Sequence, residues 1–253
     1  MTSSPHLPYT TLATDIFAEA VQACRQSVHM TPLSANDKEY FAQDWFEQRL
    51  QAIALPYVQQ GRNSYPDFIV NGASVSEGYE LKSLGFANGR PARSDIDFNS
   101  TIPSGFKDNR HVFLVFILYT GSGNNPRPVQ SLIIAHADLI NADHAVADAH
   151  VNVSIRNFGS YADGFIRSRK MYVFPHPISI DPSGLGRQRL IVPQSWNISD
   201  PRLAKVGTLQ RTVAAQAVDS FTIQLHGRGQ AQTNYVPYPN AGTQLQFDVF
   251  EAN

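Results

Sequence analysis

The chain has little cysteine, little charge and no long apolar segment, and each shortage excludes a class of protein. A single cysteine, Cys24, excludes an internal disulfide and any zinc site built from several cysteines, and it fits a reducing cytoplasm. No apolar run approaches the roughly 20 residues that cross a bilayer, and residues 1–15 lack the basic and apolar segments of a secretory signal. We therefore expect an intracellular protein with no membrane partner.

Charged residues form only 16% of the 253 residues, and they are unevenly distributed. A formal net charge of −1 argues against a protein that coats nucleic acid nonspecifically. Residues 1–150 hold 10 Lys or Arg against 15 Asp or Glu, a net −5, whereas residues 151–253 hold 10 against 6, a net +4. A polyanion would meet the second part first, although a chance scatter of surface charge explains the same numbers equally well.

Hydrophobic residues form 42% of the chain, and their spacing predicts a globular α/β (α+β) fold. Helical spacing predicts one helix that starts after Thr10 or Thr11 and ends before Pro32, with Cys24 buried on its apolar stripe, and a second helix that ends near Pro56. The uninterrupted apolar run 111–119 predicts a strand covered on both faces at the centre of a sheet. Shorter strands are expected at 68–70, 77–83, 132–135, 171–174, 190–192, 221–225 and 245–250, and a short helix at 142–150.

The two parts of the chain differ in their predicted elements. Helical signals weaken beyond residue 150, where short strand signals alternate with Gly, Pro and Asn turns. The pattern leaves open whether residues 151–253 form a separate domain or extra strands of the same sheet. We expect one domain over residues 1–253, with residues 1–150 as its core and residues 151–253 as a β-rich portion of the same unit.

One short stretch gathers the residue types that hold a hard cation. Glu80 and Lys82 are two apart in a predicted strand, so their side chains leave the same face, away from the core. Asp67 opens the preceding strand, and the turn signal Asn71–Gly72 predicts a hairpin that brings its carboxylate to the same place. Two carboxylates and one ammonium group are therefore expected in a small volume.

Such a cluster suits phosphodiester hydrolysis, which requires oxygen ligands for Mg²⁺, an attacking water and positive charge near the phosphorus. Asp67 and Glu80 would bind the metal directly, with the backbone carbonyl of Leu81 as a further ligand. Lys82 would orient or deprotonate the water, or stabilise the transition state electrostatically; the sequence does not choose between these roles. The alternative without catalysis is a solvent-exposed hairpin that carries one ion pair.

Pro66–Asp67, followed after a hairpin by Glu80–Leu81–Lys82, resembles the PD-(D/E)xK signature of restriction-endonuclease-like nucleases. The resemblance implies a mixed central sheet flanked by helices, a Mg²⁺ cofactor that Mn²⁺ can replace, no nucleotide cofactor and double-stranded DNA as substrate. Within this superfamily the chain is similar to type II restriction endonucleases, which implies the cytoplasm of a prokaryote. Some members bring a glutamate from an early helix to the metal, so Glu47 is a conditional further ligand, with a solvated helix face as the alternative.

Two polar segments are candidates for DNA contacts. The first is a long loop expected between the catalytic strand and the central strand, where basic and short polar side chains could contact phosphates and bases. The second precedes the strand expected at 171–174 and places basic residues beside aromatic ones. We therefore expect residues 1–150 to form the catalytic core and the β-rich residues 151–253 to complete the DNA-binding surface. The candidates are Arg90, Arg93, Asn99, Ser100, Thr101, Lys107 and Arg110 in the first segment and Arg167, Arg169 and Lys170 in the second. An ordinary solvated loop and a basic strand end are the competing interpretations.

The sequence leaves several alternatives open for the oligomeric state and for the exact activity. Cutting both strands of a palindromic duplex calls for two active sites, so a homodimer is the simplest assembly, although a monomer that nicks each strand in turn would carry the same motif. A DNA-repair or recombination nuclease with the same active site is the nearest rival, and a noncatalytic β-rich binding protein is the other. The histidines show no metal-binding spacing, and His111, His136 and His226 are interpreted as core or edge residues.

Overall fold

A large mixed sheet forms the centre of the molecule. The computed structural model describes residues 12–34, 40–61, 64–99, 102–142, 171–226 and 230–253. The strands of this sheet are β1 (Tyr57–Gln59), β2 (Phe68–Asn71), β3 (Ser76–Ala87), β4 (Arg90–Pro91), β6 (Phe106–Lys107), β7 (Arg110–Tyr119), β8 (Val129–His136), β10 (Gln188–Pro193), β11 (Leu203–Thr212) and β14 (Gln244–Ala252). Eight of them follow the order β1-β2-β3-β7-β8-β10-β14-β11, and β4 and β6 attach to β3 and β7.

Strand directions in the sheet are mixed. β3 runs parallel to β7 and β8 runs parallel to β10, whereas the other neighbouring pairs are antiparallel. The hairpin predicted from Asn71–Gly72 is confirmed, because β2 and β3 pair directly and the Gly72 amide donates to the Val75 carbonyl at 2.7 Å. Strand β10 lies between β8 and β14, so residues on both sides of position 150 contribute to one sheet.

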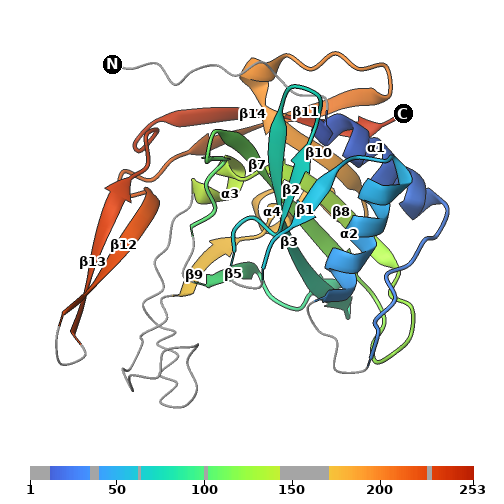
Figure 1. Cartoon of the computed structure of the whole chain (residues 1–253). Coiled ribbons are helices and arrows are strands. Elements are labelled where there is room, and N and C mark those ends of the chain that lie inside the picture. Colours follow the sequence, from blue (N-terminus) through green and yellow to red (C-terminus); the bar gives the residue numbers. More distant parts are fainter. Residues whose placement is uncertain (1–11, 35–39, 62–63, 100–101, 143–170, 227–229) are drawn as a thin grey trace.

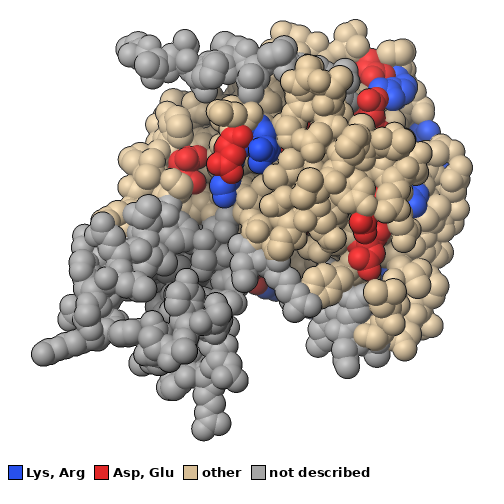
Figure 2. All heavy atoms as spheres, in the orientation of Figure 1, with Lys and Arg blue, Asp and Glu red and all other residues tan. Residues whose placement is uncertain are grey.

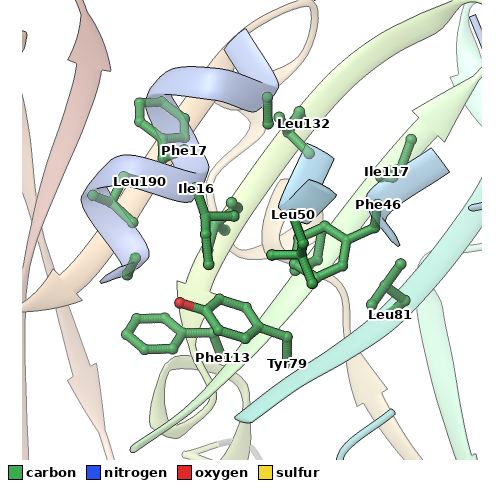
Figure 3. Packing of buried hydrophobic residues seen from close by; sticks show 14 of the residues in the cluster. Ile16, Phe17, Phe46, Leu50, Tyr79, Leu81, Phe113, Ile117, Leu132 and Leu190 are labelled. Carbon is green, nitrogen blue, oxygen red and sulfur yellow. The ribbon is translucent and has the colours of Figure 1, made fainter. Parts of the chain in front are cut away.

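Two helices, α1 (Leu12–Arg25) and α2 (Tyr40–Ala52), cover one face of the sheet and confirm the two helices predicted near the start of the chain. Figure 1 shows both helices together on the same side. Figure 3 shows the first core beneath them, where Ile16 and Phe17 of α1 and Phe46 of α2 pack against Tyr79 and Phe113 of the sheet. Each fully buried side chain of this size contributes about 1.5–3 kcal/mol to stability.

Cys24 packs against the edge of the first core. The thiol is partly buried, and that burial raises its pKa to about 11, with Arg49 opposing the change. A thiol that keeps its proton is a poor nucleophile. Cys24 therefore lies beside the first core on helix α1, as predicted, but it is partly exposed and not fully buried.

A different set of elements packs on the opposite face of the sheet. Strands β5 (Asp95–Asn99) and β9 (Met171–Pro175) pair antiparallel, and the one-turn helices α3 (Asp138–Asn141) and α4 (Pro177–Ile180) flank them. A second core forms beneath this cover, where Phe98, Phe116 and Phe174 are buried together. Strand β7 is thus covered on both faces, as its apolar run predicts, and few helices surround the sheet.

The prediction of a long loop between the catalytic strand and the central strand is wrong. That segment forms the short strands β4, β5 and β6 instead. In β5, Ile96 and Phe98 alternate with Asp95 and Asp97, and pairing with β9 buries the two apolar side chains. The partner strand lies more than 70 residues later in the chain, so the local sequence could not indicate it.

Strands β12 (Val218–His226) and β13 (Gln230–Pro237) form a separate two-stranded ribbon that projects from the body in Figure 1. Two short 3₁₀ turns, η1 (Pro182–Gly184) and η2 (Gln194–Trp196), complete the described elements. The strands predicted at 132–135, 171–174, 190–192, 221–225 and 245–250 are all present. The helix expected at 142–150 falls almost entirely outside the described residues, and no described helix has the length and apolar character to cross a membrane.

Candidate active site

Strands β2 and β3 bring Asp67 and Glu80 together. Phe68 lies opposite Tyr79 in their antiparallel register, and Asp67 immediately precedes Phe68, beside the stretch of β3 that holds Glu80 and Leu81. The Oδ2 atom of Asp67 accepts a hydrogen bond of 2.8 Å from the backbone N–H of Leu81. The first acidic residue of the motif is therefore bound to the strand that carries the other two motif residues.

Helix α2 adds a contact to Asp67 that the sequence did not reveal. The side-chain amide of Gln43 donates to Oδ1 of Asp67 at 2.9 Å, so each carboxylate oxygen accepts one hydrogen bond and the orientation of the group is fixed. Glu47, one helical turn later, instead accepts a hydrogen bond of 2.5 Å from the Tyr57 hydroxyl. The geometry gives Glu47 a structural partner and no support as a metal ligand.

Glu80 and Lys82 share the face of β3 opposite the first core, as their spacing predicts. The Lys82 Nζ atom lies 2.7 Å from Oε1 of Glu80 and 4.6 Å from the centre of the Phe98 ring. Because β5 covers this face, Glu80 is only 7% exposed. The expectation that these side chains point away from the core is wrong, because they face the second core. A solvent-exposed ion pair does not describe a carboxylate this buried.

Burial and mutual repulsion control the charges of the site. Burial, and then the neighbouring Glu80 carboxylate, raise the pKa of Asp67 to about 7, against the hydrogen bond from the Leu81 amide. Burial alone would lower the pKa of Lys82, but the carboxylates of Glu80, Asp67 and Asp97 outweigh it and raise the pKa above the ordinary value. Lys82 is therefore a charged ammonium at neutral pH, and two neighbouring carboxylates repel each other.

The donor set suits a hard divalent cation. The second oxygen of Glu80, Oε2, is buried and has no hydrogen-bond partner among the described residues. The N–H and C=O of one strand residue point to the same side, so the Leu81 carbonyl lies on the side from which its N–H reaches Asp67. Within the described residues, no group of three or more His, Cys, Asp or Glu side chains converges. Mg²⁺ needs only one or two carboxylates, because water and substrate phosphate oxygens complete its coordination.

The basic residues predicted to contact DNA lie in different settings. Arg90 is exposed where β4 follows the end of β3. The Arg93 guanidinium lies 2.6 Å from the Asp97 carboxylate, so it already has an acidic partner. Lys107 is exposed, with Nζ 3.4 Å from the Tyr65 carbonyl oxygen and 5.0 Å from the centre of its ring, which places it beside the segment leading to the site.

The other predicted DNA contacts are described less fully. Arg110 opens β7 half-buried, and its Nε atom is buried without a hydrogen-bond partner among the described residues. Asn99 is the last residue of β5. The remaining candidates lie outside the described residues: Ser100, Thr101, Arg167, Arg169 and Lys170. On the face seen in Figure 2, the described charged residues form small groups rather than a broad basic surface.

A second polar cluster joins the start of β7 to the end of β8. Nδ1 of His111 lies 3.2 Å from Nε2 of His136, and Nδ1 of His136 lies 3.6 Å from the Asp138 carboxylate. Asp138 also accepts a hydrogen bond of 2.8 Å from the Gly105 amide. Burial lowers the pKa of His136 to about 3, and burial with the nearby His136 lowers that of His111 to about 4. Both imidazoles are neutral above pH 5, consistent with the interpretation of these histidines as core or edge residues.

No protein-family model matches the chain, and no curated protein is significantly similar to it. The functional assignment therefore depends on the chemistry of the site.

Proposed function

We propose that this protein is a Mg²⁺-dependent endonuclease that hydrolyses phosphodiester bonds in double-stranded DNA at specific sites, as type II restriction endonucleases do. One observation carries the proposal: the Asp67 carboxylate accepts a hydrogen bond from the backbone N–H of Leu81, the residue between Glu80 and Lys82, which are themselves paired at 2.7 Å. Three residues of a PD…ExK pattern that are up to 15 positions apart, Asp67, Glu80 and Lys82, thus lie together beside the start of β2. A chance sequence match does not require this convergence.

Asp67, Glu80 and the Leu81 carbonyl would hold the metal ion. A cation between the two carboxylates would offset the burial and the repulsion by Glu80 that together raise the pKa of Asp67. Oε2 of Glu80, which has no hydrogen-bond partner among the described residues, would become a ligand of that cation. When bound, Mg²⁺ neutralises phosphate charge and makes water a stronger nucleophile. The Gln43 amide and the Leu81 N–H fix the Asp67 carboxylate in place before the substrate arrives.

Lys82 would act as a fixed positive charge. Its raised pKa supports a protonated side chain, which donates hydrogen bonds and cannot accept a proton from water. Stabilising the extra negative charge of the pentacoordinate phosphorus, or orienting the attacking water, are roles that an ammonium group can perform. General-base catalysis by Lys82 receives no support from this charge state.

The wider features of a restriction enzyme belong to the same proposal. The mixed sheet with α1 and α2 on one face is compatible with a restriction-endonuclease-like core. A palindromic target would call for a homodimer with one active site per strand. A restriction role would place the protein in the cytoplasm of a prokaryote, with Mn²⁺ able to replace Mg²⁺.

Cleavage of plasmid and phage DNA tests the proposal directly. Purified protein is incubated with each DNA in Mg²⁺ or in EDTA, beside the variant Glu80→Gln. The matched control is Glu19→Gln, which removes a carboxylate from a helix ion pair with Arg49 at 3.4 Å. We expect discrete fragments in Mg²⁺ from the wild type and the control, and cleavage at least about 100-fold slower from Glu80→Gln.

The other outcomes identify the rival functions. A Mg²⁺-dependent smear that requires Glu80 would indicate a repair-type or nonspecific nuclease. Intact DNA in every reaction, together with DNA binding that Glu80→Gln leaves unchanged, would indicate a noncatalytic binding protein and refute the proposal.

A further inference from the structure

The β6–β7 hairpin places two cations side by side at its tip. Asp108 and Asn109 form a two-residue loop, and both have positive φ angles, 50° and 59°, as a type I′ turn requires. Lys107 and Arg110 flank this loop and lie directly opposite each other. Opposite side chains of an antiparallel pair share a face with Cβ atoms about 5 Å apart, and like charges there are destabilising. The hairpin tip, residues 107–110, therefore holds two cations at an unfavourable separation.

Neither cation is neutralised within the described part of the chain. Lys107 is exposed, with its Nζ atom 3.4 Å from the carbonyl oxygen of Tyr65 and 5.0 Å from the centre of the Tyr65 ring. Arg110 is half-buried, and its Nε atom is buried without a hydrogen-bond partner among the described residues. No carboxylate of those residues, Asp108 included, forms an ion pair with either side chain, whereas Arg189 lies 2.7 Å from a carboxylate oxygen. The hairpin tip therefore has the charge to bind an anion.

The hairpin tip lies on the face of the sheet that carries the candidate catalytic side chains. Arg110 and Leu114 are four residues apart in β7, so their side chains leave the same face. Leu114 lies beside Glu80 in the parallel register of β3 and β7, and it packs in the second core. Four residues of strand span about 13 Å. The tip therefore lies about that far along the sheet from Glu80, on the face that Lys82 shares.

The chain segment that enters the candidate site packs beside the hairpin tip. Gly78, two residues before Glu80, has no side chain, and a methyl group there would lie 2.5 Å from Cγ of Pro66. The Pro66 ring therefore occupies the face that Glu80 shares. Lys107 packs on the ring of Tyr65, the residue before Pro66. One of the two cations thus contacts the segment that continues directly into the first carboxylate of the site.

We propose that Lys107 and Arg110 together hold one backbone phosphate of the DNA beside the candidate active site. This inference rests on the proposed function for its ligand, double-stranded DNA, and adds a contact that positions the duplex. A phosphate between the two side chains would offset their repulsion, and a guanidinium group can donate two parallel hydrogen bonds to phosphate oxygens. About 13 Å corresponds to roughly four base-pair steps of about 3.4 Å, so one duplex can contact both the tip and the candidate metal ligands. Phosphate contacts fix the register of a protein on DNA without reading its sequence.

Two double variants that remove equal charge test the proposal. The hairpin variant is Lys107→Gln/Arg110→Gln. The control is Arg187→Gln/Lys205→Gln, which removes two cations, 62% and 47% exposed, beside β10 and on β11, in the half of the sheet away from β3. Binding of a fluorescein-labelled duplex is measured by fluorescence anisotropy at several NaCl concentrations, in EDTA to prevent metal-dependent cleavage. Circular dichroism and thermal unfolding check the folds, and Lys107→Gln alone, a change at an exposed side chain, serves if the double variant does not fold.

We expect the control to bind the duplex within about twofold of the wild type, because salt screens distant exposed charges. The hairpin variant should bind about 10-fold more weakly at about 0.1 M salt, and the slope of log affinity against log salt should fall by about 1, because one phosphate contact is lost. Two duplexes of unrelated sequence should lose equal affinity, and Lys107→Arg, which keeps the charge, should retain binding within about threefold. In Mg²⁺, KM should rise in proportion while kcat changes less than about threefold, because the tip does not contact the reacting atoms.

Several results would overturn the phosphate contact. These are no binding of any duplex by the wild type, an equal loss in the control, a loss confined to one duplex, or displacement of the duplex by millimolar inorganic phosphate at constant ionic strength, which would indicate a site for the free anion. Wild-type affinity of the hairpin variant, with Mg²⁺-dependent cleavage intact, would refute the phosphate contact alone. A loss of binding specific to the hairpin variant, combined with a wild type that never cuts DNA in Mg²⁺, would refute the nuclease proposal alone.

Discussion

Asp67→Asn is expected to abolish cleavage and, without metal, to make the protein more stable above neutral pH. The substitution keeps the shape of the side chain. Its carbonyl oxygen can accept from the Leu81 N–H, and its amino group can donate to the Gln43 oxygen once that amide rotates, so both hydrogen bonds survive. What disappears is a carboxylate held beside Glu80 in a buried site.

The size of the gain follows from the pKa of Asp67. The unfolded chain releases this proton near the ordinary pKa of 3.8, whereas the folded protein holds it until about pH 7. Folding is therefore penalised increasingly as pH rises from about 4 to 7, and the penalty is constant above 7. The difference in pKa corresponds to at most about 4 kcal/mol, and because the side chain is only partly buried we expect a gain of about 2 kcal/mol at pH 8.

Urea denaturation in EDTA at two pH values measures this gain. We expect Asp67→Asn to be more stable than the wild type by about 2 kcal/mol at pH 8 and by only about 0.5 kcal/mol near pH 4.5. The control is Asp95→Asn, an aspartate 39% exposed that lies 3.7 Å from Arg93, where we expect changes below about 1 kcal/mol at both pH values. Lower stability of Asp67→Asn at pH 8, or a gain that does not depend on pH, would refute the reasoning.

Three further predictions concern the other groups described above. Lys82→Met should slow cleavage at least about 100-fold while DNA binding changes less than about threefold; parallel losses of both would argue against a transition-state role. Burial holds the pKa of His136 near 3 and that of His111 near 4, below the ordinary 6.5. As pH falls from 6.5 toward 4, the unfolded chain therefore binds protons at these histidines that the folded protein does not, and the free energy of unfolding decreases. Over that range the wild type should lose on the order of 2–4 kcal/mol of unfolding free energy in urea relative to a His111→Gln/His136→Gln variant, because the buried carboxyl groups, which act in the opposite direction, titrate alike in both proteins; a difference that does not change with pH would contradict the neutral, buried pair. Gly105→Ala places a methyl group against the His136 ring and the Asp138 carboxylate, so thermal unfolding should reveal destabilisation of about 3 kcal/mol; a wild-type melting temperature would show that the packing can relax.

The parts of the fold that the sequence predicts are those determined by local periodicity. Helices α1 and α2, the Asn71–Gly72 hairpin and the buried strand β7 each depend on spacing within fewer than 20 residues. The hairpin also brings Asp67 beside Glu80, because the register of two adjacent strands follows from a tight turn. The convergence of the motif was therefore predictable.

The surroundings of the motif depend on contacts between distant segments, and these were not predictable. Alternation shows that Glu80 leaves the face opposite Tyr79, but only the pairing of β5 with β9 covers that face and buries the carboxylate. The contact from Gln43 had a weak signal, because Gln43 and Glu47 lie one turn apart on α2 and either could face the site. The partner of Glu47 is Tyr57, which no helical pattern indicates.

Metal binding to the candidate site is the decisive measurement, because Asp67, Glu80 and the Leu81 carbonyl must hold a divalent cation for the proposed chemistry. Free Mn²⁺ is titrated by electron paramagnetic resonance against the wild type, the Asp67→Asn/Glu80→Gln double variant and the Glu19→Gln control. We expect saturable Mn²⁺ binding to the wild type and the control, competition by Mg²⁺, and no binding to the double variant. Absence of binding to the wild type, or equal binding to the double variant, would contradict this metal site.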